Sequence, residues 1–377
     1  IYRRKLGVYM SYLLFLGMGS LTAIFRKNRV ICSILVFLFW IAMTFNTLIA
    51  DRGQYQKFYS DPVAAKEEWG YTQLQLIAKT IGLSFQAFFA IIIGAALLMI
   101  LYTVLRASLN PGWTLVLYLI FPFTMDAAQV RSFVAAAFIA TGLVVLAKDR
   151  SLSSIVKYLA LVTGGVMFHY SAIFFYLVVI AYFVPTAVLY LATTLFALFT
   201  ASNLNNVIRF VGRLLPFIDY KIKRYYHADS MTAPAEIKGY TIYLILLSLL
   251  ALIAWLMIRH SLKNPNERFF ASKQHLAKIN NYYYNHADLV IKVNALLMLA
   301  LPLLSISVSF DRLIRACLLS NYILFANALG SKASWWVKTL FAIACLLFVG
   351  YYFNFYIYSR FPEVVFRSVF EQNLFLP

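Results

Sequence analysis

The sequence predicts an all-α, polytopic integral membrane protein with about 11–13 membrane helices of roughly 20 residues, some of them short or broken. Two observations predict this class. Of the 377 residues, 62% are hydrophobic and only 12% are charged, whereas soluble domains are roughly 45–50% apolar and 25% charged. The apolar residues also form long continuous runs rather than alternating with polar ones, which excludes an outer-membrane barrel.

Apolar runs follow one another along residues 1–377, which we interpret as a single helical membrane domain. They lie at about residues 7–25, 29–50, 81–105, 112–126, 130–147, 155–168, 170–200, 239–258, 288–308, 312–330 and 334–358. The run at 170–200 is too long for one span, and Pro185 is expected to divide it because proline breaks or kinks a helix. The runs at 112–126 and 155–168 are short, so we expect helices that tilt or stop inside the membrane.

Polar segments and basic clusters give the expected orientation. Polar segments longer than ordinary turns lie at 49–78, 201–238 and 259–287. Lysine and arginine clusters favour the cytoplasmic side, and the predicted topology places them together, at 26–29, 148–157, 259–287 and 332–338. We therefore predict a cytoplasmic loop at 259–287, an outer interfacial segment at 49–78 and an outer loop at 201–238. Asp126 and His169 then lie towards the outer side.

Charge and motif content narrow the possible chemistry. The net charge of +19 is explained by cationic loops that contact anionic lipid headgroups, and an anionic lipid-linked substrate remains open. No soluble basic domain exists to bind nucleic acid. Cys32, Cys317 and Cys345 lie in apolar runs without metal-ligand spacing. No Walker A, Rossmann, H-E-x-x-H or D-x-D motif occurs, so we expect no metal and no cofactor.

The first polar constellation directly follows the second apolar run. Asp51, Tyr55 and Tyr59 are spaced i, i+4, i+8 and therefore share one face of a helix. Glu68 and Tyr71 follow in the same segment. One interpretation is an interfacial helix with aromatic anchors, since tyrosine suits the membrane–water boundary. The other is a ledge that stacks sugar rings on aromatic side chains and holds their hydroxyls with Asp51 and Glu68.

The second constellation contains Asp126, Gln129 and Arg131 between two apolar runs. An ionisable group at such a position needs a partner or a function. Either Asp126 pairs with Arg131 and sets the helix ends, or Arg131 binds a phosphate or diphosphate with its planar guanidinium.

The third constellation is His169, preceded by Gly164 and Gly165. Glycines permit an irregular or closely packed backbone. His169 is either a hydrogen-bonded structural residue, a general base or a hydrogen-bond partner of a diphosphate.

The fourth constellation is Asp311, Arg312 and Arg315, which share one face at a helix start. It is either an intramembrane ion pair that satisfies itself or, together with Arg131, a site for a polyanionic headgroup.

In this order, the constellations resemble the EpsG-like family of bacterial polysaccharide polymerases, often grouped with the Wzy-type O-antigen polymerases. The resemblance covers most of the chain and is carried by Asp51, Tyr55, Tyr59, Glu68-x-Gly70-Tyr71, Arg131-Ser132-x-x-Ala135, His169-x-Ser171-Ala172 and Asp311-Arg312. Ser132 departs from the family pattern, which more often has Gln after the arginine. Tyr322 matches only loosely the Tyr that commonly follows the final Asp-Arg, and 201–238 has no matched feature.

This resemblance implies a metal-independent glycosyltransferase of the helical, polyprenyl-linked (GT-C) type in the bacterial inner (cytoplasmic) membrane. Such an enzyme passes a growing glycan from undecaprenyl diphosphate to a sugar hydroxyl on an incoming undecaprenyl-diphosphate repeat unit at the outer face. The product is an O-antigen, capsule or exopolysaccharide. A flippase and a chain-length regulator are the protein partners that the resemblance suggests.

The roles that this chemistry needs are a cationic site for the leaving diphosphate and a base for the acceptor hydroxyl. The candidates for diphosphate binding are Arg131, Arg312 and Arg315. The candidates for the base are Asp51, Glu68 and His169, and the sequence does not choose among them. The residues expected to bind or orient substrate are Tyr55, Tyr59, Tyr71, Asp126, Gln129 and Asp311.

Three alternatives stay open. Another lipid-linked glycosyltransferase fits the same residues. A transporter or flippase of lipid-linked sugars would also carry intramembrane cations, but such folds contain repeats and the sequence has none. A membrane acyltransferase acting on cell-surface glycans would use His169, but its thioester donor comes from the cytoplasmic side, opposite to the predicted position of that residue.

Overall fold

The structure, a computed structural model, describes residues 2–49, 51–63, 68–149, 151–203, 206, 234–263, 273–371 and 373–375. Throughout these residues the secondary structure is helical, apart from an isolated antiparallel bridge between Asn46 and Asn373. Almost all of the buried hydrophobic residues form one continuous cluster. The all-α class predicted from the sequence is therefore confirmed.

Before His169, the described residues form nine helices. They are α1 (Tyr2–Ile24), α2 (Arg29–Thr44), α3 (Arg52–Ser60), α4 (Trp69–Thr80), α5 (Phe85–Ala107), α6 (Pro111–Ile120), α7 (Phe123–Ala128), α8 (Val130–Leu146) and α9 (Leu152–Phe168). The remainder comprises the 3₁₀ helix η1 (Tyr170–Tyr176), α10 (Leu177–Phe183), α11 (Thr186–Ser202), α14 (Pro234–Lys263), α15 (Lys273–Leu297), α16 (Ala300–Ile306), η3 (Val308–Phe310), α17 (Asp311–Leu329), α18 (Trp335–Phe353), the π-helical turns η4 (Asn354–Tyr358) and η5 (Pro362–Arg367), and α19 (Ser368–Glu371).

Several of the described helices have the length and composition to cross a membrane. Three long apolar ones do so by themselves, at Phe85–Ala107, Glu236–Leu262 and Trp335–Tyr358. The α15–α16 pair, bent by 40°, is a fourth if it counts as one broken span. The described residues also contain seven apolar helices of 10–17 residues. The chain is thus a polytopic membrane protein built from long and short helices together.

Two predicted boundaries can be compared directly with the helices. The run at 170–200 is divided at Pro185, because α10 ends at Phe183 and α11 begins at Thr186. The expected loop at 259–287 is largely helical instead, since α14 continues to Lys263 and α15 begins at Lys273. The polar first half and the apolar second half of α15 form one helix. The expected outer loop at 201–238 lies mostly outside the described residues.

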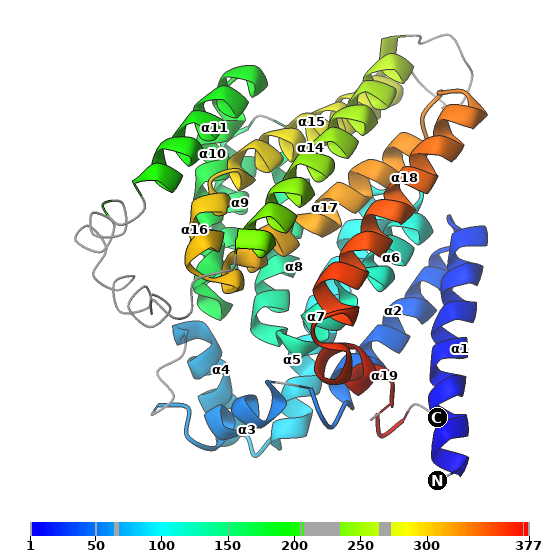
Figure 1. Ribbon diagram of the computed structural model, residues 1–377, viewed down its shortest axis with the longest axis vertical. Coiled ribbons are helices and arrows are strands. Elements are labelled where there is room, and N and C mark those ends of the chain that lie inside the picture. The colour runs from blue at the N-terminus through cyan, green and yellow to red at the C-terminus, as the bar shows by residue number, and fades with distance from the viewer. Residues whose placement is uncertain are drawn as a thin grey trace.

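The helices alternate in direction, which gathers the basic connections at one end of the bundle. The backbone N–H of Gly112 donates to the Arg26 carbonyl over 2.8 Å, and that of Lys332 donates to Ser261 Oγ over 2.7 Å. The Gly112 contact needs glycine, because a Cβ there would lie 2.2 Å from the Thr22 carbonyl oxygen. Helices α3 and α4 lie at the opposite end (Figure 1).

Helix α17 occupies the centre of the bundle and is buried along almost its whole length. Its buried asparagines form hydrogen bonds within the protein, as expected for polar side chains in a membrane interior. Asn321 and Asn294 donate to each other over 3.1 and 2.8 Å. Asn327 joins α17 to the α5–α6 connection, accepting from the Leu109 N–H and donating to the Ala107 carbonyl. The start of this central helix carries the fourth constellation.

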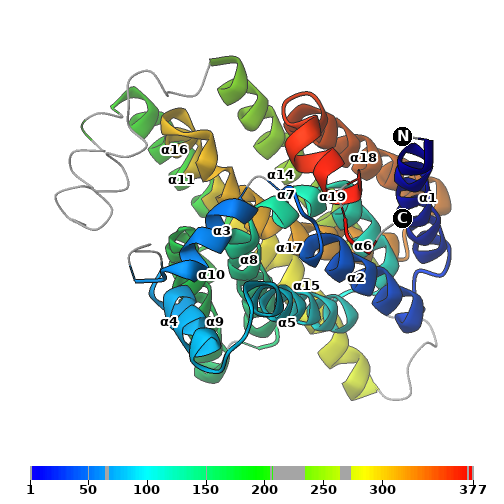
Figure 2. The same ribbon diagram turned by 90° about the horizontal axis from the view of Figure 1, so that it is seen from below.

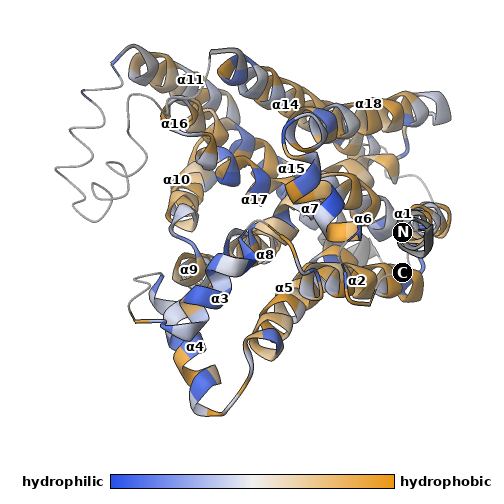
Figure 3. Cartoon of the chain, turned by 60° about the horizontal axis from the view of Figure 1, so that its bottom comes forward, coloured by the Kyte–Doolittle hydropathy of each residue, from blue (hydrophilic) through white to orange (hydrophobic). Residues whose placement is uncertain are grey.

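At the end that holds α3 and α4, the helices are more hydrophilic (Figure 3). Hydrophilic residues concentrate on these two short helices, whereas α5 and α18 are coloured mainly as apolar (Figure 3). Seen from below, α3 and α4 lie beside α8 and α9 (Figure 2). The polar constellations of the sequence meet here.

Candidate active site

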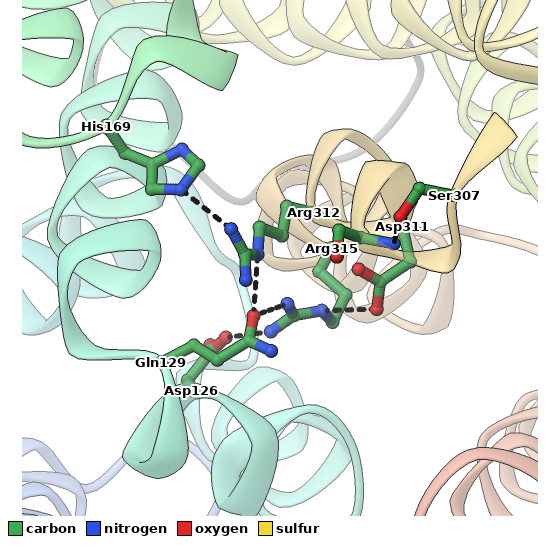
Figure 4. Close-up of polar contacts among 8 residues, drawn as sticks. Asp126, Gln129, His169, Ser307, Asp311, Arg312 and Arg315 are labelled. Carbon is green, nitrogen blue, oxygen red and sulfur yellow. Dashed lines mark hydrogen bonds and ion pairs between the residues drawn. The ribbon is translucent and has the colours of Figure 1, made fainter. Parts of the chain in front are cut away.

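A break between α7 and α8 faces the first turn of α17. Gln129 sits in that break, after Ala128 ends α7 and before Val130 begins α8. On the other side, the turn η3 leads directly into α17, with Ser307 Oγ accepting from the Ser309 N–H over 3.2 Å. The start of α17 thereby projects its charged residues at the break (Figure 4).

Arg315 is the buried centre of this arrangement. Its Nε lies 3.0 Å from Asp311 Oδ2 and its Nη1 lies 3.1 Å from Asp126 Oδ1. Its Nη2 donates to Gln129 Oε1. The Arg315 side chain is 4% exposed, and Tyr118 OH donates to the second oxygen of Asp126 over 2.9 Å. A buried guanidinium is tolerated because two carboxylates and an amide oxygen surround it.

Gln129 connects this buried cluster to the second arginine of α17. Its Oε1 accepts from Arg312 Nε over 2.9 Å as well as from Arg315. The amide oxygen has two lone pairs and can serve both donors. Unlike Arg315, Arg312 is only half-buried, so its guanidinium reaches the surface of the cluster in a fixed orientation.

His169 holds the other edge of the Arg312 guanidinium. Its Nε2 lies 3.0 Å from Arg312 Nη1, and its Nδ1 lies 2.7 Å from Ser171 Oγ. Arginine only donates hydrogen bonds, so Nε2 is the acceptor in this contact. The ring is brought here by close packing of α9 on α8, since a Cβ at Gly164 would lie 2.8 Å from the Phe138 ring.

Arg131 forms a separate site with the α3–α4 segment. Its Nη1 pairs with Glu68 Oε2, and the exposed fractions of the two side chains are 17% and 1%. The guanidinium carbon lies 5.8, 5.5 and 5.7 Å from the ring centres of Tyr55, Phe58 and Tyr71. Aromatic faces attract a cation, so the rings and the carboxylate together fix the guanidinium.

The expected alternative of an Asp126–Arg131 pair is therefore wrong. The break at Gln129 turns the two side chains apart, although they are five residues apart in sequence. Asp126 faces Arg315 across the bundle, and Arg131 faces Glu68.

Asp51 differs from the other candidate bases. It precedes α3, and its side chain makes no capping hydrogen bond. Within the described part of the chain its carboxylate takes part in no hydrogen bond or ion pair. Burial raises the pKa of the Asp51 carboxyl above its ordinary value, while the positive charges of Arg312 and Arg131 act in the opposite direction. Asp51 is thus half-buried, near both arginines, and bonded to neither.

The comparisons with known proteins match this chain to one family. The model of the EpsG family matches residues 29–368, nearly the whole length. The chain belongs to the EpsG family. No curated protein and no solved structure matches it. Membership confirms the resemblance seen in the sequence and supports a polysaccharide-polymerase type of role for a membrane protein.

In this EpsG-family protein the tyrosines of the first constellation face the protein rather than the solvent. Tyr55 and Tyr59 are buried, and Tyr59 OH donates to the Leu83 carbonyl over 2.6 Å. Tyr71 is also buried, with its ring centre 5.8 Å from that of Phe88. The helix face predicted from the i, i+4, i+8 spacing thus packs α3 onto α5. On this face, the Tyr55 ring lies under the guanidinium of Arg131.

Two residues that contact the site were not predicted from the sequence. Phe58 contacts Arg131, and its signal is the i+3 spacing from Tyr55, which places it on a neighbouring part of the same helix face. Tyr118 bonds Asp126 across the α6–α7 corner. No local pattern announces that contact, because it depends on how the corner folds.

Proposed function

We propose that this protein is a polysaccharide polymerase that joins undecaprenyl-diphosphate-linked repeat units at the outer face of the bacterial inner membrane, without a metal ion. One observation carries the proposal. The guanidiniums of Arg131 and Arg312 are held in fixed orientations, and both act electrostatically on Asp51, a carboxylate that has no bonded partner among the described residues.

The arginines supply the electrostatic part of the reaction. When the bond between the sugar and the diphosphate breaks, negative charge builds up on the departing phosphate oxygens. Fixed donors aimed at that charge lower the barrier without having to reorganise. Arg312 is held by Gln129 and His169, and Arg131 by Glu68, so both have already lost their freedom before substrate binds.

Arg315 has a positioning role in this mechanism rather than a direct one. It is buried, and it donates to Asp311, Asp126 and Gln129. By fixing Gln129 it fixes the partner of Arg312. Asp126 and Asp311 compensate its charge and act on the substrate only through this chain of contacts.

Asp51 is the base in this mechanism. It takes the proton from the acceptor hydroxyl, whose oxygen forms a bond to the anomeric carbon of the growing glycan. The bond from that carbon to the diphosphate oxygen breaks, and undecaprenyl diphosphate leaves. Glu68 is paired with Arg131, and the Nε2 of His169 is engaged by Arg312. In this mechanism Glu68 and His169 therefore hold the arginines, and neither accepts the proton.

The placement at the outer face rests on the arrangement of the bundle. The site lies at the end that holds α3 and α4, and the short basic connections lie at the opposite end. Basic loops favour the cytoplasm. The substrate then arrives from a flippase that delivers lipid-linked units to the outer leaflet, and a chain-length regulator is the second partner that we propose.

Deletion in the host followed by gel analysis of the surface glycan tests this function. A polymerase mutant keeps a single repeat unit and loses the long ladder. Wild-type protein restores the ladder, and Arg131→Gln does not. Loss of all surface glycan, including the single unit, places the protein in export or assembly and contradicts the proposal.

A further inference from the structure

An apolar groove lies beside the Arg131 site, between α4, α5 and α8. Its volume is about 360 Å³, and every residue that lines it is apolar. The residues that line it include Ile77 of α4, Ala95 of α5 and Phe138 of α8. A groove without a polar lining group has no means of binding a sugar, so it calls for a hydrocarbon occupant.

The groove opens at the surface of the molecule. Ile77, Ile81 and Ile91 line it and are 56%, 67% and 58% exposed. Clustered exposed side chains of this size mark a surface that contacts lipid or another apolar partner. In a membrane protein, this opening lets a lipid chain enter from the side.

Two residues that line the groove lie next to the arginine sites along the chain. Val134 lines the groove one helical turn after Arg131 on α8, and Phe168 lines it immediately before His169. Phe88 of the groove also contacts the ring of Tyr71, which lies under Arg131. Hydrocarbon surface therefore changes to fixed positive charge within about one turn of helix, about 5.4 Å along its axis.

We propose that this groove binds the polyisoprenyl chain of the lipid-linked substrate, with the attached diphosphate at Arg131. The assignment rests on the proposed function for the identity of the lipid. A diphosphate offers more anionic oxygens to Arg131 and Arg312 than the phosphodiester of a bilayer phospholipid does. A single groove beside Arg131 thus suits a one-chain diphosphate lipid better than a two-chain phospholipid.

Photo-cross-linking of the full-length protein in phosphatidylglycerol nanodiscs tests this assignment without requiring turnover. Benzoylphenylalanine is introduced at Ala95, an exposed groove residue, or at Ala192, an exposed residue of α11 outside the groove. Labelled undecaprenyl diphosphate is the probe. We expect cross-linking at Ala95 and not at Ala192, with loss on adding unlabelled undecaprenyl diphosphate. Equal yields at the two positions, or a yield at Ala95 that excess phosphatidylglycerol removes, overturn the proposal.

A kinetic arm uses Ala95→Trp, which fills the groove, with Ala192→Trp as the matched control. Losing the burial of about two methylene groups corresponds to about tenfold weaker binding. We therefore expect KM for a donor with the full chain to rise about tenfold, and KM for a two-isoprene donor to stay unchanged. An equal rise for both donors contradicts a chain-binding groove.

The two arms separate this assignment from the proposed function. Specific cross-linking at Ala95 by a protein that polymerises nothing supports the groove and refutes the polymerase. Polymerisation by a protein without specific cross-linking at Ala95 refutes the groove alone.

Discussion

The Arg312 guanidinium and the His169 imidazole meet over 3.0 Å, although 143 residues separate them in the chain. The contact joins the start of the central helix α17 to the turn that ends α9. Because Gln129 holds the same guanidinium through Nε, Arg312 is fixed from two sides while remaining half-buried. This is the arrangement expected of a group that meets a charged substrate, rather than of one that only balances a buried charge.

Replacing Arg312 tests its role in stabilising the leaving group. Arg312→Gln removes a fixed charge and should lower kcat by about 10²–10³-fold, the usual effect of deleting one such donor. Arg312→Lys keeps the charge but loses the planar fork, so we expect it to remain well below wild type. The measurement is single-turnover release of undecaprenyl diphosphate. Arg367→Gln, in an exposed pair with Glu363, is the control, and an active Arg312→Gln variant contradicts the assignment.

Asp51 should set the acidic limb of the pH profile. Asp51→Asn is expected to lower kcat by about 10²–10⁴-fold, as loss of a general base does. Burial raises the pKa of the Asp51 carboxyl, and the base works only when ionised. Wild-type activity should therefore fall, as pH decreases, at a higher pH than the ordinary value of about 3.9 implies.

The pH profile of kcat/KM distinguishes Asp51 from Glu68. Glu68→Gln removes the carboxylate that pairs with Arg131 and should lower the rate but keep the acidic limb. Asp61→Asn, on an exposed carboxylate of the same segment, should leave both unchanged. An acidic limb that persists in Asp51→Asn and vanishes in Glu68→Gln would reverse the two roles.

Arg315 should matter for stability as well as for rate. Its removal leaves Asp126 and Asp311 buried without their partner, and breaking a buried ion pair in this way costs about 3–5 kcal/mol. Arg315→Met should therefore lower the unfolding midpoint in detergent, whereas Arg312→Gln should not. Intrinsic fluorescence during heating measures both. A fully stable but inactive Arg315→Met protein would instead indicate direct contact with substrate.

The orientation is tested by labelling single cysteines in spheroplasts with an impermeant thiol reagent. The background lacks Cys32, Cys317 and Cys345, which are all buried. Ser60 and Ser153 are both exposed in the fold, so only the side of the membrane should decide which is labelled. Cysteine at Ser60, on the predicted outer side, should be labelled, and cysteine at Ser153, on the predicted cytoplasmic side, should not. The reverse pattern would place the site on the cytoplasmic side.

Sequence reasoning predicted the parts of the fold that depend on local composition. Long apolar runs became helices, and Pro185 divided the run in which it lies. The prediction of a loop at 259–287 differs from the structure because polarity alone does not end a helix. Helix α15 already starts at Lys273.

The site was predictable as a set of residues but not as a set of pairs. Glu68 and Arg131 are 63 residues apart, and only the packing of α4 near α8 brings them together. The closer pair, Asp126 and Arg131, is separated by the break at Gln129. Spacing predicts which side chains share a helix face, whereas ion pairs between helices depend on the tertiary packing.

The most direct test of the proposed polymerase is an assay of the purified protein with one synthetic undecaprenyl-diphosphate repeat unit in the presence of EDTA. We predict a ladder of products that differ by one repeat unit, with one undecaprenyl diphosphate released for each linkage formed. Asp51→Asn and Arg312→Gln should form no ladder under the same conditions, and Arg367→Gln should form the wild-type ladder. A wild-type protein that releases no undecaprenyl diphosphate, or that does so only after a divalent cation is restored, would contradict a metal-independent polymerase.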